Sequence, residues 1–307
     1  MKGAYHNICK VILNTISSLN FKDLLKLYLD LSKIRITVSI TITCIIGYLL
    51  FSSSLTYLLL FAVIGTFFLS AGSSALNHYQ EIEFDALMDR TAKRPMASKS
   101  ISSTHGFIFA IACALIGYLI LMFYVNEMSA YLGLTALLVY NGIYTPLKRK
   151  TTLAVFPGAI IGAIPPMIGW VAAGGHVLDI QILALAFFIF FWQIPHFWLL
   201  VLVYEEDYRK AGYPTLTDKL NLQQLKRVTF IWIFNLAICS IIFPFFKLTQ
   251  SLVVSIIFLI SGSYMIWGSR NLLTEEYDKK IIKKTFLRVN LFVLIVLFTL
   301  IIEKLVK

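Results

Sequence analysis

Charged residues are scarce in this chain. They make up 14% of its 307 residues, against about 25% in a typical soluble domain. Hydrophobic residues reach 58%, and they fall in blocks long enough to cross a lipid bilayer. The scarcity of charge excludes an ordinary soluble domain and predicts an all-α integral membrane protein with several spanning helices.

Cysteine and linker sequence are also scarce. The chain has only four cysteines: Cys9, Cys44, Cys113 and Cys239. Their spacing fits neither a metal site nor a disulfide framework. No stretch rich in Pro, Ser and Gly divides the chain, and it has no evident internal repeat. We therefore expect one polytopic domain over residues 34–307, preceded by an N-terminal segment, 1–33.

The N-terminal segment lacks the basic start, short apolar core and small-residue cleavage site of a signal peptide. Apolar side chains recur at helical spacing between charged ones near its end. They are Phe21, Leu24, Leu25, Tyr28 and Leu31. This pattern predicts an amphipathic helix on the cytoplasmic face of the membrane, with a regulatory or targeting segment as the alternative.

Nine apolar segments are candidate membrane spans. They are residues 34–52, 55–78, 104–124, 128–144, 153–173, 178–203, 227–246, 250–268 and 286–304. Short connections with few charges alternate with longer, charge-rich ones. The charge-rich connections are 79–103, 145–152, 204–226 and 269–285. We expect a bundle of nine transmembrane helices with a cytoplasmic cap formed by these charged loops.

Basic residues mark one side of the expected bundle. Of 27 Lys and Arg residues, only Lys247, Lys304 and Lys307 fall on the sparsely charged side, which leaves 24 on the side of the N-terminus. Cytoplasmic loops are enriched in Lys and Arg, so we expect the N-terminus in the cytoplasm and, with nine spans, the C-terminus outside. This asymmetry also explains the net charge of +11, and we expect no nucleic-acid partner.

The segment 77–95 joins an apolar run to a dense group of charges. An amide and three carboxylates recur there at steps of four: Asn77, Glu81, Asp85 and Asp89. On a continuous helix such steps keep the side chains on one broad face. Carboxylates gathered at a membrane boundary resist desolvation and need a counter-charge, which a divalent metal supplies. Three cations follow and suggest an anion on that metal: Arg90, Lys93 and Arg94. The alternative is a solvated helix end.

Two residues at the end of the fourth expected span can face one pocket. Tyr144 and Lys148 stand four residues apart, which places a phenol and an ammonium on the same side of a helix. Arg149 and Lys150 follow directly. A topology anchor made of three cations is the alternative reading of this group.

The sixth expected span carries a polar group that lipid disfavours. His196 lies inside it, and an ionisable side chain within a span usually faces a cavity or a partner. Pro195 interrupts the helical hydrogen bonds beside it. Asp207 follows the span and is the natural second acid opposite Asp85. A packing role for His196 is the alternative.

Small residues are dense in the fifth expected span. They include Gly158, Gly162, Ala163 and Gly169, with Pro165 and Pro166 between them. Such residues let helices approach closely, or leave room for a flat ligand.

Together these segments resemble the intramembrane prenyltransferases of the UbiA superfamily, and within it the branch that farnesylates haem. The resemblance extends from about Lys33 to the ninth expected span. It is carried by Asn77, Asp85, Met88, Asp89, Arg90, Thr91, Arg94, Pro95, Tyr144, Lys148, Arg149, Gly162, Pro165, Pro166, Gly169, Trp170, Trp192, Gln193, Pro195, His196, Asp207 and Tyr208. Glu81 departs from the family pattern, which typically has Asp there.

The resemblance implies transfer of farnesyl from farnesyl diphosphate to a vinyl group of protohaem IX, which gives haem O and releases diphosphate. It implies a multi-pass protein of the bacterial plasma (inner) membrane, in contact with membrane lipid, with Mg²⁺ as cofactor. Whether the protein also contacts a haem A synthase or a terminal oxidase assembly stays open.

On this basis we expect four groups of site residues. The metal ligands are Asn77, Glu81, Asp85 and Asp207. The diphosphate-binding residues are Arg90, Lys93, Arg94, Lys148, Arg149, Arg209 and Lys210. The catalytic set is Asn77, Glu81, Asp85, Asp89, Tyr144, Lys148, His196 and Asp207. The pocket for haem and prenyl chain contains Pro166, Trp170, Trp192 and His196. His196 can contact haem iron, bind a propionate or orient a water molecule, and the sequence leaves these alternatives open.

Two other functions compete with this one. A quinone-pathway prenyltransferase acts on an aromatic acid, but the Pro165-Pro166 and Pro195-His196 pairs disfavour it. A secondary transporter holds its ions near the bilayer midplane, whereas the acids here gather at one face.

Overall fold

The computed structural model describes residues 20–274 and 278–306. The first 19 residues, with Cys9 and most of the expected N-terminal segment, lie outside the described residues, as does Lys307. All regular structure in the described part of the chain is helical.

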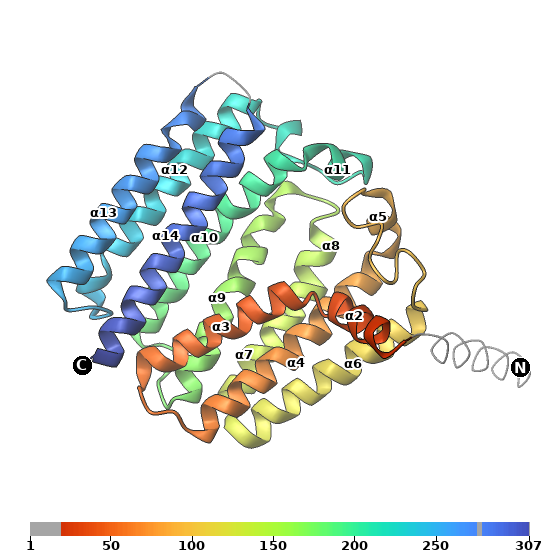
Figure 1. The fold of residues 1–307 in the computed structure, drawn as a ribbon, viewed down its shortest axis with the longest axis horizontal. Coiled ribbons are helices and arrows are strands. Elements are labelled where there is room, and N and C mark those ends of the chain that lie inside the picture. The colour runs from red at the N-terminus through yellow and green to blue at the C-terminus, as the bar shows by residue number, and fades with distance from the viewer. Residues whose placement is uncertain (1–19, 275–277, 307) are drawn as a thin grey trace, which may run out of the picture.

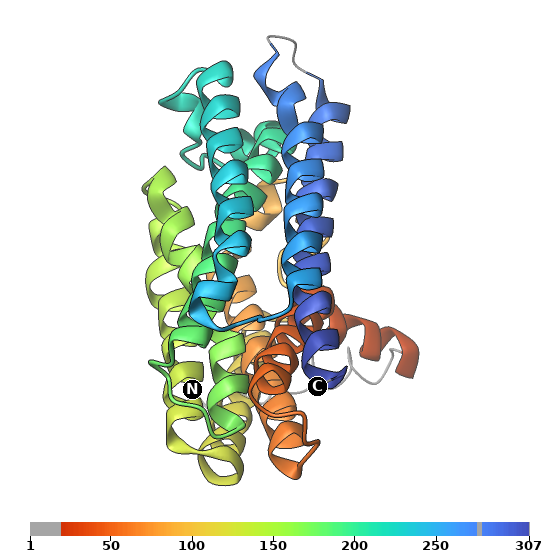
Figure 2. The same cartoon turned by 90° about the vertical axis from the view of Figure 1, so that its left-hand side faces the viewer.

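Long helices run side by side in one bundle (Figures 1 and 2). They are α3 (Ile34–Phe51), α4 (Tyr57–Gln80), α6 (Ser103–Ile120), α7 (Glu127–Leu137), α9 (Val155–Ala172), α10 (Ile180–Val203), α12 (Leu222–Ile241), α13 (Leu252–Ser269) and α14 (Lys279–Val306). The shorter α-helices are α2 (Phe21–Leu31), α5 (Ile82–Leu87), α8 (Thr145–Leu147) and α11 (Glu205–Lys210). Figure 1 shows α5 and α11 together at one end of the bundle.

Eight helices among residues 20–274 and 278–306 are long and apolar enough to cross a membrane, so the expected count of nine is wrong by this measure. The exception is the fourth expected span. It is helical from Glu127 to Leu147, but a π-helical turn, η2 (Leu138–Tyr144), separates α7 from α8. Asn141 and Thr145 are buried there, and such polar residues lower the mean hydropathy of the segment below that of the other spanning helices.

This interrupted segment nevertheless connects the two ends of the bundle. At its start, the Asn126 side chain donates a hydrogen bond to the Val171 carbonyl, near the end of α9. After its end, Lys148 pairs with Glu81, just beyond α4. Because α9 and α4 end on opposite sides of the bundle, the segment carries the chain from the sparsely charged end to the charged one.

The expected amphipathic helix near the N-terminus is present as α2. Leu31 is fully buried at its end, and the rings of Tyr28 and Phe109 on α6 lie 4.9 Å apart. Phe21 and Leu25 are exposed. One side of α2 therefore packs on the bundle while apolar residues on its other sides stay uncovered.

Small residues bring α3 and α9 into close contact, as expected. A Cβ atom on Gly47 would lie 1.9 Å from the Pro166 carbonyl oxygen, and one on Gly169 would lie 1.8 Å from that of Cys44. Only glycine fits at either position. The three described cysteines, Cys44, Cys113 and Cys239, are free and buried.

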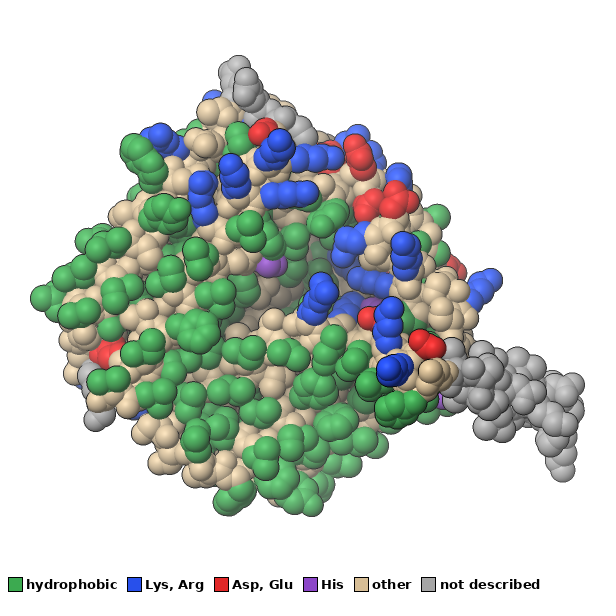
Figure 3. All heavy atoms as spheres, in the orientation of Figure 1, with side chains coloured by type: hydrophobic (Ala, Val, Ile, Leu, Met, Phe, Trp, Pro, Cys, Tyr) green, Lys and Arg blue, Asp and Glu red, His purple; other side chains and the backbone are tan. Residues whose placement is uncertain are grey.

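Charge and apolar surface separate along the bundle. In Figure 3, Lys and Arg gather over one end, and apolar side chains cover much of the rest of the visible face. The same view shows a hollow between α14 and α3, with basic side chains along one side of it and a histidine on its wall. The chemistry-bearing residues are thus concentrated at one end of an otherwise lipid-compatible surface.

Candidate active site

The segment 77–89 is not the continuous helix that its spacing suggests. α4 ends at Gln80, Glu81 leaves the helical conformation (φ −114°, ψ 14°), and α5 covers only Ile82–Leu87. Asn77, Glu81 and Asp85 are each 1% exposed. The Asp89 side chain is 77% exposed, so the expected face of four polar residues is reduced to three.

Asn77 is held between the start of α3 and the end of the π-helical turn. Lys33 Nζ donates to Asn77 Oδ1 at 2.5 Å, and Asn77 Nδ2 donates to Thr145 Oγ1 at 3.0 Å. Lys33 has a left-handed backbone conformation, with φ of 45°, which is uncommon for a residue with a side chain. This strained turn between α2 and α3 carries the ammonium of Lys33 into the site.

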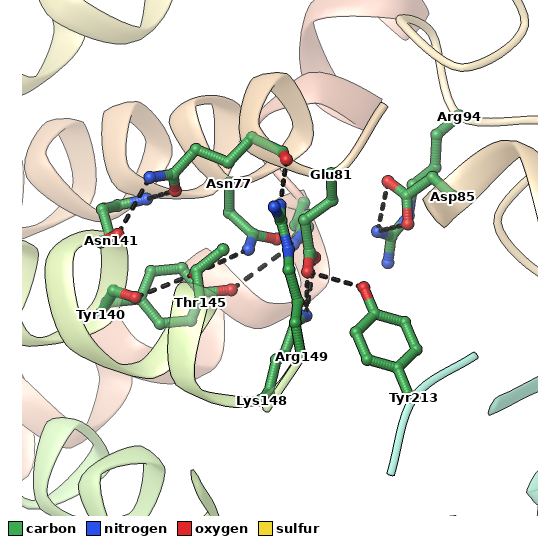
Figure 4. Close-up of polar contacts among 12 residues, drawn as sticks. Asn77, Glu81, Asp85, Arg94, Tyr140, Asn141, Thr145, Lys148, Arg149 and Tyr213 are labelled. Carbon is green, nitrogen blue, oxygen red and sulfur yellow. Dashed lines mark hydrogen bonds and ion pairs between the residues drawn. The ribbon is translucent and has the colours of Figure 1, made fainter. Parts of the chain in front are cut away.

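Glu81 has partners from two distant parts of the chain (Figure 4). Lys148 Nζ lies 2.5 Å from its Oε1, and the Tyr213 hydroxyl donates to the same oxygen at 2.9 Å. Lys148 also lies 5.5 Å from the ring centres of both Tyr144 and Tyr213. The prediction that Tyr144 and Lys148 share a pocket is therefore confirmed.

Asp85 pairs with Arg94 from the loop that follows α5. One guanidinium nitrogen lies 2.7 Å from Oδ1 and 2.8 Å from Oδ2. The Thr91 hydroxyl donates to the Asp85 backbone carbonyl at 2.9 Å. This bond connects the loop that carries Arg94 to the end of α5. Arg94 is 22% exposed, so its guanidinium faces the outside of the cluster while the carboxylate is enclosed.

Arg149 ties this cluster to the end of α4. Its guanidinium donates to the Gln80 carbonyl and stacks over the Phe84 ring at 4.6 Å. The Gln80 side chain in turn exchanges hydrogen bonds with Asn141 in the π-helical turn, at 2.9 and 3.1 Å. π-Helical turns are common at functional sites, and this one fastens α7 and α8 to the end of α4.

Positive charge is in excess around these acids. Burial of the ammonium group, together with the nearby Arg94, holds the pKa of Lys33 well below its ordinary value. Burial also lowers the pKa of Lys148, and Glu81 offsets only part of that effect. Burial alone would raise the pKa of Glu81, but Lys148 and Lys33 hold it below its usual range. The cluster therefore lacks negative charge and is suited to an anion.

The acids do not form a metal site by themselves. Among the residues that the structure describes, no three or more His, Cys, Asp or Glu side chains converge closely enough to hold a metal ion. The expected grouping of Asp207 with Glu81 and Asp85 is therefore not preassembled. Mg²⁺ commonly binds through one or two carboxylates together with phosphate oxygens. The buried oxygens of Asn77, Glu81 and Asp85 fit an ion that arrives with a diphosphate.

Several residues expected at the site lie outside the buried cluster. Asp89 pairs with Lys210 at 2.5 Å, and Arg209 pairs with Glu205 at 3.0 Å on the surface of α11. Arg90 lies 5.3 Å from the ring centre of Tyr204. Lys93 is exposed. The contacts of Asp89 and Arg90 connect α11 to the loop after α5, and none of the four cations reaches the buried carboxylates.

The expected aromatic pocket is divided between two places. Trp170 donates from Nε1 to Asp179 at 2.8 Å, near the sparsely charged end of α9, and Pro166 packs against α3. Trp192 and His196 lie on α10 and both contact Asn290 on α14, at 3.0 and 2.9 Å. The structure thus brings Trp192 and His196 together and leaves Trp170 elsewhere.

A small cavity lies beside the ion cluster, next to Lys148 and Tyr213. It has a volume of about 90 Å³, and its walls include Tyr144, Lys148, Phe197, Tyr208 and Tyr213. The ring centres of Tyr144 and Phe197 lie 6.5 Å apart. His196 does not line this cavity, but its ring centre lies 5.8 Å from that of Phe197, which does.

Sequence reasoning missed several site residues. Lys33 carried no signal of burial, because a lysine before a span usually marks its cytoplasmic flank. Tyr213 and Asn290 carried no signal, because single polar residues do not reveal their partners 132 and 94 positions away. His78 was also missed; it is buried beside Asn77, and neither ring nitrogen has a hydrogen-bond partner within the described residues.

Comparison with known proteins identifies the family of this chain. The sequence model of the UbiA prenyltransferase family matches residues 40–294. The chain belongs to this family. A protoheme IX farnesyltransferase of Nitratidesulfovibrio vulgaris (strain DP4) is 32% identical over 235 residues, which are 76% of this chain and 82% of that protein.

Solved structures of UbiA relatives share the fold. A structure of digeranylgeranylglyceryl phosphate synthase aligns with a TM-score of 0.76 and 20% identity, over 92% of this chain and 99% of that one. A UbiA homologue from Archaeoglobus fulgidus bound to GPP and Mg²⁺ aligns with a TM-score of 0.64 and 16% identity, over 89% and 99%. The expected UbiA-type fold is thus confirmed, and this member of the family is a multi-pass membrane protein.

Proposed function

We propose that this UbiA protein transfers the farnesyl group of farnesyl diphosphate to a vinyl group of protohaem IX. The observation that carries the proposal is the buried cluster around Glu81 and Asp85, where cations outnumber the acids at the end of an apolar bundle. Similarity to a protoheme IX farnesyltransferase over three quarters of the chain supports haem as the acceptor.

The cation-rich cluster suits the leaving group of this reaction. A diphosphate carries up to about three negative charges, and breaking its bond to an allylic carbon adds charge to the departing oxygen. Lys33, Lys148 and Arg149 lie where they can neutralise that charge. One unit-charge contact at about 4 Å is worth roughly 4 kcal/mol at an effective dielectric of 20. Contacts that strengthen as the bond breaks lower the barrier.

The protein's own carboxylates and amide then hold the metal. Asn77, Glu81 and Asp85 are the proposed Mg²⁺ ligands, with Asp207 as a further ligand once diphosphate is present. When bound, the ion supplies positive charge to the phosphate oxygens. Tyr144, which lines the same small cavity as Lys148, would donate a hydrogen bond to the diphosphate through its hydroxyl. Arg94 orients Asp85.

The acceptor side requires a dry, aromatic environment. The C–O bond of farnesyl diphosphate breaks, and its electron pair leaves with the diphosphate. The farnesyl cation then forms a C–C bond with the terminal vinyl carbon of haem. The new cation beside the pyrrole is captured by water, which loses a proton and leaves a hydroxyethylfarnesyl group. The apolar helices keep water from the farnesyl cation until that bond has formed.

The same proposal includes an orientation in a bacterial plasma membrane. The charged connections, and with them the ion cluster, face the cytoplasm, and the enrichment of Lys and Arg in these connections supports this orientation. α14 begins next to one of these connections and ends at the opposite side, where Glu303 accepts a hydrogen bond from Thr249. Its C-terminal end therefore faces the outside.

Product analysis tests the proposed reaction. Membranes that contain the protein are supplied with farnesyl diphosphate and Mg²⁺, together with haem or 4-hydroxybenzoate, and the products are weighed by mass spectrometry. We expect the hydroxyethylfarnesyl derivative of haem and no prenylated benzoate. A prenylated benzoate with no haem product would instead assign the chain to the quinone-pathway branch.

A further inference from the structure

Asn290 on α14 joins the two polar side chains of the aromatic pocket. Trp192 Nε1 donates to its Oδ1 at 3.0 Å, and His196 Nδ1 lies 2.9 Å from the same oxygen. Asn290 Nδ2 donates to the Phe286 carbonyl at 2.8 Å. The side-chain oxygen of one residue on α14 thus contacts ring nitrogens of two aromatic residues on α10.

These contacts determine which nitrogen of His196 carries the hydrogen. An indole N–H can only donate and a backbone carbonyl can only accept, so the two other contacts fix the orientation of the Asn290 amide. Its oxygen cannot donate. His196 Nδ1 must therefore be the protonated nitrogen, and in the neutral imidazole the lone pair lies on Nε2.

The surroundings of His196 suit a flat aromatic ligand. Its ring centre lies 5.1 Å from that of Trp192, 5.8 Å from Phe197 and 4.8 Å from Phe286. In the described part of the chain, no side chain or backbone group forms a hydrogen bond with Nε2. Asn290 thus holds the imidazole through Nδ1, and the lone pair on Nε2 stays available beside the rings of Trp192, Phe197 and Phe286.

We propose that His196 Nε2 binds the haem iron of the acceptor and that Asn290 is the positioning residue that fixes the required tautomer and orientation. A histidine that ligates a metal almost always donates its other ring hydrogen to an oxygen acceptor, and Asn290 provides that acceptor. The inference rests on the proposed function, because haem is the proposed acceptor. It selects iron binding over the other two roles that the sequence left open for His196.

Iron binding can be distinguished from a propionate contact or the orientation of a water molecule by comparing two porphyrins that differ only in the metal. The purified full-length protein is titrated with ferric haem and with metal-free protoporphyrin IX, which shares the propionates and vinyl groups. Binding is followed by absorption and fluorescence, and the iron by electron paramagnetic resonance. We compare the wild type with His196→Phe, Asn290→Leu and Asn290→Asp. Asn235→Leu is the matched control, since Asn235 makes the same hydrogen bond to a carbonyl four residues earlier, at 2.9 Å.

Asn290→Leu should weaken ferric haem binding roughly 10–100-fold, the usual loss when the hydrogen-bond partner of a ligating histidine is removed. His196→Phe should weaken it at least as much and abolish the spectrum of nitrogen-ligated iron. Both variants should bind metal-free protoporphyrin IX as the wild type does, which also shows that they are folded. Asn290→Asp should retain haem binding because a carboxylate oxygen still accepts from Nδ1, and Asn235→Leu should change neither affinity.

Equal losses for the two porphyrins would overturn the inference, because a propionate contact or simple packing does not depend on iron. An unchanged iron spectrum in His196→Phe would overturn it as well. If the wild type still converts haem to its farnesylated product in either case, the proposed function stands and only the ligand assignment fails. A wild type that neither binds nor farnesylates haem would instead refute the proposed function.

Discussion

Two kinds of ion pair arise from the same short segment, 77–95. Glu81–Lys148 and Asp85–Arg94 have carboxylates that are 2% and 1% exposed. Asp89–Lys210 has side chains that are 77% and 53% exposed, although its N–O distance of 2.5 Å is just as short. Four-residue spacing thus identifies the acidic residues of the segment. Burial then decides which of them can take part in a binding site for a metal ion and a diphosphate.

The physical difference between the two kinds of pair is the dielectric environment. Exposed pairs are screened by water and salt and contribute little. A charge that loses its partner in a buried pair is costly, so the cluster favours any ligand that restores the balance of charge. The chemistry of the proposed reaction should therefore depend on the buried pairs and be nearly indifferent to the exposed one.

Removal of Mg²⁺ should reduce farnesyl transfer more than any of the substitutions below. Arg94 and Lys148 are already paired with Asp85 and Glu81, so the diphosphate needs the further positive charge of the metal, and chelation should abolish farnesyl transfer. Product formation is measured by mass spectrometry before and after treatment with EDTA, and again after Mg²⁺ is restored. Turnover that persists under chelation would contradict the assignment of Asn77, Glu81 and Asp85 as metal ligands.

Asp85→Asn should reduce turnover by about 10³-fold or more, the scale of losing a major electrostatic group in the transition state. The amide keeps the volume of the side chain, and Arg94 retains contact with water because it is 22% exposed. The variant should therefore remain folded and inserted, which thermal unfolding in detergent checks. Wild-type turnover in this variant would remove the buried pair from the mechanism.

Lys148→Ala should weaken the binding of farnesyl diphosphate by roughly 100-fold, because the variant loses a charge-assisted contact in a buried site. Haem binding should change much less. Titration with each substrate separately measures the two effects. Lys210→Ala is the matched control, since it removes the lysine of the exposed pair. Equal losses for both substrates would argue against a diphosphate role for Lys148.

Diphosphate binding should weaken as the pH rises through the lowered pKa of Lys33. Burial and Arg94 depress this pKa, so the ammonium loses its proton well below the ordinary range, and affinity then falls by up to about tenfold per pH unit. Binding of the anion raises the pKa again and takes up protons. Calorimetry in buffers of different ionisation enthalpy measures this uptake.

Lys33→Arg provides the control for this titration. A guanidinium stays charged throughout the accessible pH range, so the variant should bind diphosphate with a shallower pH dependence and less proton uptake. The same slope in both proteins would show that another group is responsible.

Asp89→Asn should have the smallest effect, with turnover within about twofold of the wild type, as is usual for exposed pairs. It is the matched partner of Asp85→Asn, since both substitutions remove one carboxylate from the same segment. Turnover is compared in the same assay. A large loss would mean that the segment rearranges when substrate binds and brings Asp89 into the cluster.

Much of the fold followed from the sequence, and its one failure has a local cause. Apolar blocks located eight spanning helices, most of them to within a few residues. The larger deviations are α12, which begins and ends five residues earlier than expected, and α14, which begins seven residues earlier. The fourth span failed because Asn141 and Thr145 face α4 and the chain forms a π-helical turn there. Composition cannot show whether such polar groups interrupt a helix or find partners within it.

The site was predicted in its residue types but not in its contacts. Asn77, Glu81, Asp85 and Lys148 were identified from spacing and resemblance, and the structure places them in one cluster. Asp89 was assigned wrongly to the buried face because helical spacing assumes that the helix continues past Glu81. Lys33 enters the cluster from 44 positions away, which no local pattern indicates.

Hydropathy and charge are properties of each segment alone, so they were enough to predict a helical membrane protein with its charge at one end of the bundle. Which acids are buried with which cations, and the contact of His196 with Asn290, follow from the tertiary structure. Those pairings depend on side chains that meet across helices far apart in the chain, and the burial that gives them their strength exists only once the bundle has formed.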